Sequence, residues 1–191
     1  MTAPKILSFA GSARQDSWNK KIARIAADGA REKGAQVTWI DLRDFALPLF
    51  DQDLEAQSGL PENVKKLKNL FYEHDGLLIA CPEYNSSITP LLKNTLDWIS
   101  RAENTQEISL KAYRGKVAAL LAASPGALGG LRGLVSVRSL LGNIGVIVLP
   151  EQLAVSKVHE AFDASGKLID PKQEAAIKNI GAVLANFFNK V

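Results

Sequence analysis

The stretch KILSFAGSARQDSWNKKIARIAADGAREKG, residues 5–34, contains an apolar run, a polar junction and a segment with helical spacing. Four of the first six residues, Ile6, Leu7, Phe9 and Ala10, are apolar without alternating with polar positions, which is typical of a strand covered on both faces. From residue 19 onward the apolar positions fall on one helical stripe, namely Ile22, Ile25, Ala26 and Gly29. Gly34 suits a left-handed helix cap. The stretch therefore predicts a strand, a loop and a helix.

The same order of elements recurs along the chain. Apolar runs at residues 36–41, 76–81, 116–123 and 145–150 predict further strands, and residues 60–74, 89–101, 130–143 and 171 onward have helical spacing. This alternation predicts parallel strands joined by right-handed crossovers, with helices on both faces of an open sheet. No repeat or linker interrupts it, so we expect one domain over residues 1–191.

The bulk properties exclude several classes of protein. The net charge is +3, with 23 basic and 20 acidic side chains spread along the chain, which disfavours a nucleic-acid partner. We find no apolar run long enough for a bilayer span and no signal-peptide pattern, so we expect a cytoplasmic protein without a membrane partner. A single cysteine, Cys81, and two histidines, His74 and His159, provide no metal site and no internal disulfide.

Polar loops follow three of the predicted strands. They are GSARQDSWN at residues 11–19, PEYNSS at 82–87 and SPGALGG at 124–130. In an open parallel sheet, ligands bind at the carboxyl ends of the strands near the point where the strand order reverses. We therefore expect the three loops to form one site.

The first loop has the chemistry of a terminal-phosphate site. The start of a helix presents free N–H groups and the positive end of its dipole. Ser12, Ser17 and Asn19 add side-chain donors, and Arg14 adds a charged fork that matches phosphate. The pattern is neither GxGxxG nor GxxxxGK[ST], which disfavours a nucleoside triphosphate. Alternatively, Ser17 is only a helix cap and Ser12 only a turn residue.

The second and third loops suit a planar ligand. Pro82 fixes the backbone, so that the N–H groups of Glu83, Tyr84 and Asn85 can point at a ring that Tyr84 covers. In the third loop Gly126 and Gly129 leave the backbone without side chains, which allows a flat ring to approach closely. The alternatives are an ordinary turn with a half-buried tyrosine and a flexible connection before a helix.

Other chemistries have weaker support in the sequence. Ser124 lies in AASPG, which lacks the first glycine of a nucleophile elbow, and no histidine stands in an obvious partner position. Cys81 ends an apolar run, where a cysteine is usually a small buried hydrophobe. We expect His74 and His159 at solvent-facing turns. Asp41 ends a strand and is a weak candidate for binding a ribose.

The three loops in this order, each after a strand, resemble those of the NADPH-dependent FMN reductase family, which includes bacterial quinone and chromate reductases. The relevant segments are GSARQDSWN, PEYNSSITPLLKNTLDW and SPGALGG. The resemblance covers nearly the whole chain. It implies a flavodoxin-like three-layer α/β sandwich with a five-stranded parallel sheet and helices on both faces.

The resemblance also implies an oxidoreductase with bound FMN. The FMN phosphate would bind Ser12, Arg14, Ser17 and Asn19. The flavin ring would lie along Pro82, Glu83, Tyr84 and Asn85, with Ser124, Gly126 and Gly129 at its far edge. NADPH or NADH would donate hydride, and quinones, flavins, azo dyes or metal oxyanions such as chromate would accept electrons by a ping-pong route. No side chain need act as a catalytic acid or base.

Members of this family are typically homodimers or homotetramers. Leu91 and Trp98 lie outside the core stripe of their predicted helix and would suit a partner helix. Two alternative functions remain. One is a flavodoxin-like electron carrier or flavin-binding module that accepts no hydride, although such carriers are usually strongly acidic. The other is a nucleotide-binding regulatory fold without a redox role.

Overall fold

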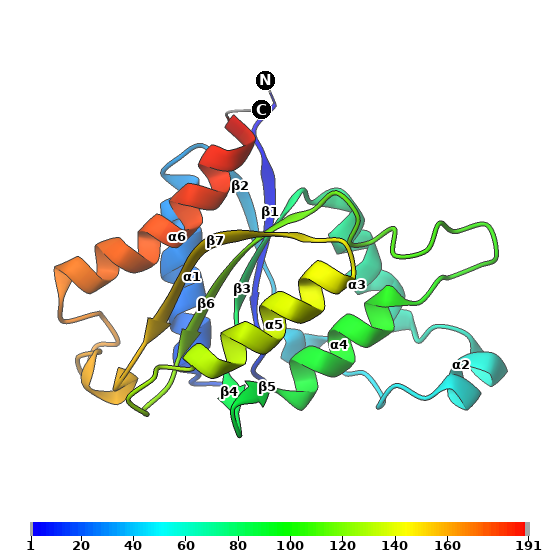
Figure 1. Ribbon diagram of the computed structural model, residues 1–191, viewed down its shortest axis with the longest axis horizontal. Coiled ribbons are helices and arrows are strands. Elements are labelled where there is room, and N and C mark those ends of the chain that lie inside the picture. The colour runs from blue at the N-terminus through cyan, green and yellow to red at the C-terminus, as the bar shows by residue number, and fades with distance from the viewer. Residues whose placement is uncertain (1, 190–191) are drawn as a thin grey trace.

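The computed structural model describes residues 2–189 and contains a five-stranded sheet in which all neighbouring strands are parallel (Figure 1). Its strands are β1 (Lys5–Ala10), β2 (Gln36–Trp39), β3 (Gly76–Ala80), β6 (Val117–Ala123) and β7 (Ile147–Val155). Their spatial order is β2-β1-β3-β6-β7, so the chain builds first on one side of β1 and then on the other. This order is flavodoxin-like, and the predicted fold class is confirmed.

Helices cover both faces of the sheet. One face carries α1 (Trp18–Arg31) and α6 (Pro171–Asn189), and the other carries α3 (Glu62–Glu73), α4 (Pro90–Ser100) and α5 (Leu131–Asn143) (Figure 1). Successive side chains of a strand point to opposite faces. Ile6 packs among the side chains of α1 and α6, while Leu7 packs among those of α3, α4 and α5. Burial on both faces explains why the strands are apolar at successive positions.

Helices α1 and α6 touch through glycines. A Cβ added to Gly29 would lie 2.0 Å from the carbonyl oxygen of Lys178, and one added to Gly181 would lie 1.8 Å from that of Ala26. Neither position has room for any side chain. The predicted place of Gly29 on the buried face of α1 is confirmed, and its reason is this close contact between the two helix backbones.

The last strand is longer than predicted. The apolar run at residues 145–150 suggests an end at Pro150, whereas β7 continues to Val155. The register with β6 shifts between Ala118 and Leu120, where their partners are Val148 and Gln152. Pro150 therefore lies in a bulge of an edge strand, the position in a sheet where a proline is tolerated.

Short elements escaped the sequence pattern. Helix α2 (Gln52–Ser58) buries none of its residues, so it has no apolar stripe. Its N-terminal cap is Asp51, whose carboxylate accepts hydrogen bonds from the N–H groups of Asp53 and Leu54. The other short elements are a hairpin of β4 (Glu83–Tyr84) and β5 (Ser87–Ile88), and 3-10 turns at Leu42–Asp44 and Val158–Glu160.

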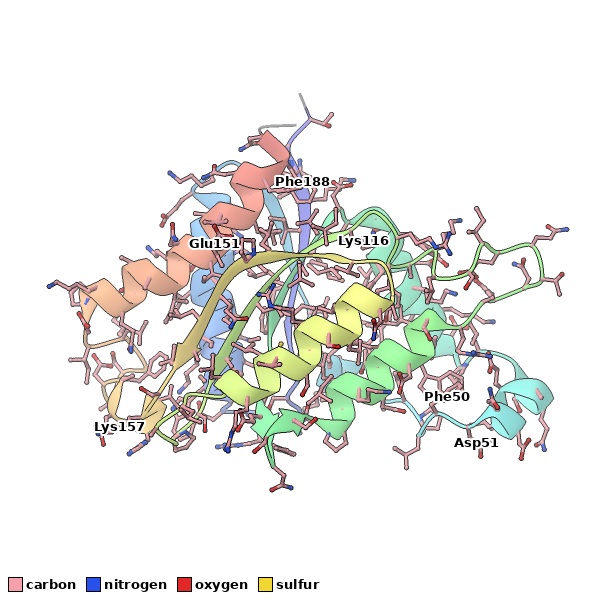
Figure 2. The ribbon with its side chains drawn as sticks, viewed as in Figure 1. Phe50, Asp51, Lys116, Glu151, Lys157 and Phe188 are labelled. Atoms are coloured by element: carbon pink, nitrogen blue, oxygen red, sulfur yellow. The ribbon has the colours of Figure 1, made fainter. Side chains whose placement is uncertain are left out.

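The prediction that Trp98 lies on the outer face of α4 is wrong. Its side chain is fully buried, and its indole N–H donates a 2.8 Å hydrogen bond to the carbonyl of Pro48. The ring of Phe50, labelled in Figure 2, meets the indole edge-on at a centroid distance of 5.0 Å. Leu91 is partly buried against the core. The segment before α2 therefore covers this part of α4 within the same chain.

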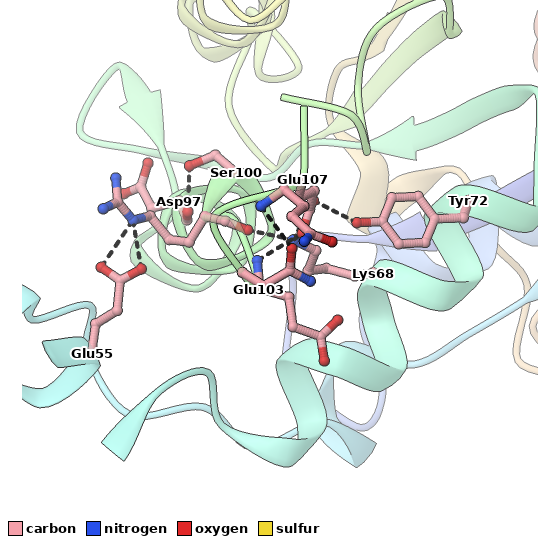
Figure 3. A network of polar contacts seen from close by, with 10 residues as sticks. Glu55, Lys68, Tyr72, Asp97, Ser100, Glu103 and Glu107 are labelled. Carbon is pink, nitrogen blue, oxygen red and sulfur yellow. Dashed lines mark hydrogen bonds and ion pairs between the residues drawn. The ribbon is translucent and has the colours of Figure 1, made fainter. Parts of the chain in front are cut away.

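An ion-pair network fastens the loop between α4 and β6 to α3 (Figure 3). The Lys68 ammonium is buried and lies 2.7 Å from the Glu107 carboxylate, which also accepts a 2.6 Å hydrogen bond from the Tyr72 hydroxyl. Lys68 donates as well to the carbonyl of Arg101, whose guanidinium pairs with Glu55. The network thus joins α2, α3 and the loop between α4 and β6.

His74 differs from its predicted exposed position. It is buried, and its two ring nitrogens lie 2.6 Å from the carbonyl of Leu70 and 2.7 Å from the Thr38 hydroxyl. His159 is about half exposed, in agreement with its prediction. Within residues 2–189, none of the helices combines the length and the apolar character that crossing a bilayer requires.

Candidate functional site

The loops that follow β1, β3 and β6 meet at the carboxyl edge of the sheet and surround a cavity of about 120 Å³. Its lining includes these predicted site residues: Ser12, Arg14, Ser17, Asn19, Pro82, Glu83, Tyr84 and Ser124. Asn85, Gly126 and Gly129, also predicted, are not part of the lining. Trp18, Ala123 and Pro125 line the cavity without having been predicted. The sequence thus indicated which loops meet and most of the side chains that they contribute.

Backbone N–H groups at the start of α1 face no partner in their own helix. The first helical hydrogen bond runs from the N–H of Lys21 to the carbonyl of Ser17, so the preceding N–H groups of Trp18, Asn19 and Lys20 have no acceptor within α1. No acidic residue lies in the first turn. This helix start therefore has the free donors and the positive dipole end that attract an anion.

Among the described residues Arg14 has no ion-pair partner beside this helix start, although its charge makes the smallest of the contributions to the Asp16 pKa. Within residues 2–189 its guanidinium forms no ion pair with a carboxylate, and it lies 5.5 Å from the centroid of the Trp18 ring. The nearby Asp16 pairs with Lys21 at 2.7 Å, and the hydrogen bond and charge of Lys21 hold the Asp16 pKa below its ordinary value. Because Lys21 balances Asp16, the Arg14 charge remains available for an anionic ligand.

Ser17 occupies the cap position of α1 without acting as a side-chain cap. Its backbone is extended, with φ −92° and ψ 126°, and its hydroxyl makes no capping hydrogen bond. The residue is 4% exposed and lines the cavity. Among the described residues no buried side-chain oxygen or nitrogen lacks a hydrogen-bond partner, so the Ser17 hydroxyl, which has none, is open to the cavity. Its position at the cavity wall, without a cap bond, favours a ligand contact over the capping alternative.

Replacing Ser17 with alanine tests this assignment. We expect the apoprotein to lose less than about 0.5 kcal/mol of stability, because no cap bond is removed, whereas a true cap typically contributes about 1 kcal/mol. We expect the affinity for an anionic ligand to fall about tenfold, the lower end of the range for a hydrogen bond to a charged group. Urea denaturation and ligand titration measure the two effects. A stability loss with unchanged affinity would restore the capping interpretation.

Asn19 joins two of the loops. Its side-chain oxygen accepts a 3.0 Å hydrogen bond from the N–H of Ala123, and its side-chain nitrogen donates a 2.9 Å bond to the carbonyl of the same residue. These paired bonds fix the start of α1 to the end of β6. One amide hydrogen remains for a ligand. Asn19 therefore holds the cavity walls together.

The second loop presents its backbone and Tyr84. The Tyr84 side chain is 55% exposed, so its ring is free to cover a ligand. The turn residues Asn85 and Ser86 have positive φ angles of 51° and 67°, which fit the two-residue turn of a hairpin. The Glu83 carboxylate is hydrogen-bonded to the N–H of Gly133 at 2.8 Å, so it is already occupied within the protein.

The third loop contributes Ser124, whose hydroxyl accepts a 3.2 Å hydrogen bond from the N–H of Gly126. A Cβ on Gly126 would meet only this hydroxyl, at 3.6 Å, so the backbone there is open. Gly129 has a positive φ of 61°, and a Cβ on it would lie 2.6 Å from the carbonyl carbon of Val155. Packing on the end of β7 explains this glycine without a ligand.

The alternative chemistries find little support in the geometry. Cys81 is fully buried and burial raises the pKa of its thiol, which disfavours a nucleophile. Both ring nitrogens of His74 are engaged elsewhere, so it does not serve Ser124 as a base. Asp41 pairs with the buried Lys20 at 2.6 Å and accepts from the N–H of Arg43, and it lies outside the cavity lining.

Known proteins are similar to this chain in fold and in sequence. The NADPH-dependent FMN reductase family model matches residues 4–160. The chain is 33% identical over 175 residues to an NAD(P)H-dependent FMN reductase of Pseudomonas aeruginosa, covering 91% of this chain and 89% of that protein. It is 32% identical over 181 residues to the NADPH:quinone oxidoreductase of Arabidopsis thaliana, covering 92% and 87%. A flavoenzyme NAD(P)H:(acceptor) oxidoreductase from Paracoccus denitrificans superposes with a TM-score of 0.78 at 26% identity over 98% of both chains.

Proposed function

The chain belongs to the NADPH-dependent FMN reductase family, and from that premise we propose that it transfers electrons from NAD(P)H through bound FMN to small acceptors by a ping-pong route. The acceptors are quinones, flavins or metal oxyanions such as chromate. Relatives named quinone reductases support the quinone part of this proposal. The observation that carries the proposal is the set of groups that line the cavity. They are the free N–H groups at the start of α1, the Arg14 guanidinium, and the Ser17 hydroxyl, which makes no capping hydrogen bond.

The donor set fits the phosphate of FMN. A cavity of about 120 Å³ is well below the roughly 300–1,000 Å³ of pockets for drug-sized ligands, so it suits a phosphate group and its immediate attachment but not a three-ring flavin. Ser12, Arg14 and Ser17 would bind the phosphate together with the N–H groups of the first turn of α1. Asn19 would contribute its remaining amide hydrogen. A dianion matches this arrangement of donors and positive charge.

The flavin ring would lie outside the small cavity, along the second and third loops. Tyr84 offers an exposed ring face, Pro82 lies two residues before it and Asn85 follows it. Ser124 and Gly126 border the open side of the third loop. Gly129 would affect the ring only indirectly, by setting the path of the backbone in the third loop. When bound, FMN supplies the hydride-accepting and electron-donating chemistry. The residues of the chain bind and orient it, and we assign none of them as a catalytic acid or base.

We further propose that the whole chain, residues 1–191, acts as one cytoplasmic FMN-binding domain and assembles as a homodimer or homotetramer. Support for assembly comes from exposed apolar side chains on α5 and the loop before it, namely Leu128, Leu131 and Val135. Sedimentation velocity measures the assembly state. A monomer at micromolar concentration would contradict this part of the proposal.

Anaerobic mixing with NADPH or NADH tests the proposed reaction. We expect purified protein loaded with FMN to lose its visible flavin absorption when the nicotinamide is mixed in, and to regain that absorption when a quinone is added. A flavodoxin-like carrier would bind FMN without direct bleaching by either nicotinamide. A protein that binds no flavin would contradict both functions and leave a nucleotide-binding role.

A further inference from the structure

The β4–β5 hairpin is held on α5 by a side chain of its own. The Glu83 carboxylate accepts a 2.8 Å hydrogen bond from the N–H of Gly133, the third residue of α5, and lies 3.3 Å from the Arg132 guanidinium. The cap residue of α5 is Gly130, which offers no side-chain cap. Glu83 therefore satisfies a free N–H group at the positive end of a helix from a distant part of the sequence.

Close packing at Gly133 accompanies this bond. A Cβ on Gly133 would lie 3.2 Å from the Cβ of Glu83 and 3.4 Å from the carbonyl oxygen of Ser87, so a side chain there would push the hairpin away. The Glu83 side chain is only 11% exposed. The hairpin thus rests directly on the backbone of α5.

The hairpin has little means of holding its own shape. Each of its strands has two residues, and its turn places Asn85 and Ser86 at positive φ. Such a short hairpin is not stable by itself, and a positive φ at serine adds strain. At its other end, the Thr89 hydroxyl donates to the carbonyl of Gly11 at 2.8 Å. Glu83 and Thr89 therefore fasten the two ends, with Tyr84 between them.

We propose that Glu83 is a positioning residue: its carboxylate holds the hairpin on α5 and so sets the place of Tyr84 against the flavin ring. This inference rests on the proposed function, because it assigns the ring to the Tyr84 side of the cavity. It differs from the family-based expectation that Glu83 itself binds the cofactor. The carboxylate acts on α5, and only the backbone and the neighbouring ring act on the ligand.

The test compares Glu83→Ala, Glu83→Gln and Arg132→Ala. In the apoprotein, we expect Glu83→Ala to speed amide hydrogen exchange of the hairpin at least tenfold, while β1 and the start of α1 keep wild-type exchange. We expect it to weaken FMN and riboflavin about equally, fivefold to tenfold, because the ring contact is common to both. Glu83→Gln keeps an oxygen acceptor for the Gly133 N–H and should recover part of each effect. Arg132→Ala should change little, since Arg132 is exposed and the Gly133 bond remains.

Two results would overturn the inference. One is wild-type hairpin exchange and wild-type flavin affinity in Glu83→Ala, and the other is a loss confined to FMN, which would place Glu83 in phosphate binding. If Glu83→Ala does not fold, the same measurements are made on Glu83→Gln. Wild-type hairpin exchange and wild-type flavin affinity in Glu83→Gln, together with faster exchange or weaker flavin binding in Arg132→Ala, would contradict the proposal. Failure of the proposed function has a separate signature, the absence of FMN binding in the wild-type protein.

Discussion

Replacing Arg14 with alanine is expected to weaken FMN binding about 10-fold to 150-fold while leaving riboflavin binding within about twofold. A hydrogen bond to a charged group contributes about 1.5–3 kcal/mol, which corresponds to this range of affinities. Arg14 lines the cavity and has no carboxylate partner within residues 2–189, so its loss removes charge from the phosphate end alone. Titration of the apoprotein with each flavin measures the difference.

Arg24→Ala is the matched control for this experiment. Arg24 lies on α1, whereas Arg14 lies in the loop before it, and Arg24 is exposed. Arg24 stacks on the Trp39 ring at 4.8 Å and does not line the cavity. The control removes an equal charge from the helix next to the loop and should leave the affinity for FMN nearly unchanged. Equal losses for FMN and riboflavin in Arg14→Ala would contradict the phosphate assignment.

Replacing Glu107 with glutamine is expected to destabilise the protein by about 3–5 kcal/mol at neutral pH. Lys68 is 1% exposed, and the substitution leaves its buried ammonium without a charged partner, which is the costly way to break such a pair. The Tyr72 hydroxyl also loses a charged acceptor. Urea denaturation measures the loss, and Glu103→Gln, an exposed carboxylate in the same loop, is the control and should change stability by less than about 0.5 kcal/mol.

The contribution of Glu107 also depends on pH. Burial alone would raise its pKa, but hydrogen bonds from the Glu103 N–H, Lys68 and Tyr72 together lower it below the ordinary value of 4.5. A carboxyl group with a lowered pKa in the folded state stabilises the fold above its ordinary pKa, and this contribution is lost as the pH falls through the folded value. We therefore expect the stability difference between wild type and Glu107→Gln to shrink below about pH 4.5. A difference that stays constant down to pH 3 would contradict the ion-pair account.

The sheet could be predicted because each strand is buried on both faces. Residues 5–10, 76–81 and 116–123 are mostly apolar and do not alternate with polar positions, and the structure places β1, β3 and β6 there within one residue of the predicted ends. The end of β7 could not be predicted in this way. Pro150 normally interrupts a ladder, and only the bulge on an edge strand shows why the strand continues past it.

The position of Trp98 depends on a contact that no local pattern encodes. Its helix alone suggests an exposed face, but Pro48 and Phe50 cover the indole from about fifty positions earlier in the chain. The covering segment is irregular, and α2 after it buries none of its residues. Neither segment has an apolar periodicity from which the contact with Trp98 could have been predicted.

Most of the site was accessible to sequence reasoning because parallel strands bring the loops after them to one edge. Loop chemistry then indicated Arg14 and Ser17 as anion-binding residues, and the structure places both at the cavity. The actual partners of polar side chains could not be inferred. Asn19 binds the backbone of Ala123, and the Glu83 carboxylate binds that of Gly133, because these contacts form only when the loops have come together.

A crystal structure of the protein grown with FMN tests most directly whether the start of α1 binds the phosphate. We expect the phosphate at the start of α1, within hydrogen-bond distance of Arg14, Ser17 and the N–H groups of the first turn, with the flavin ring beside Tyr84. An FMN molecule bound elsewhere, or with its phosphate turned to solvent away from α1, would contradict it.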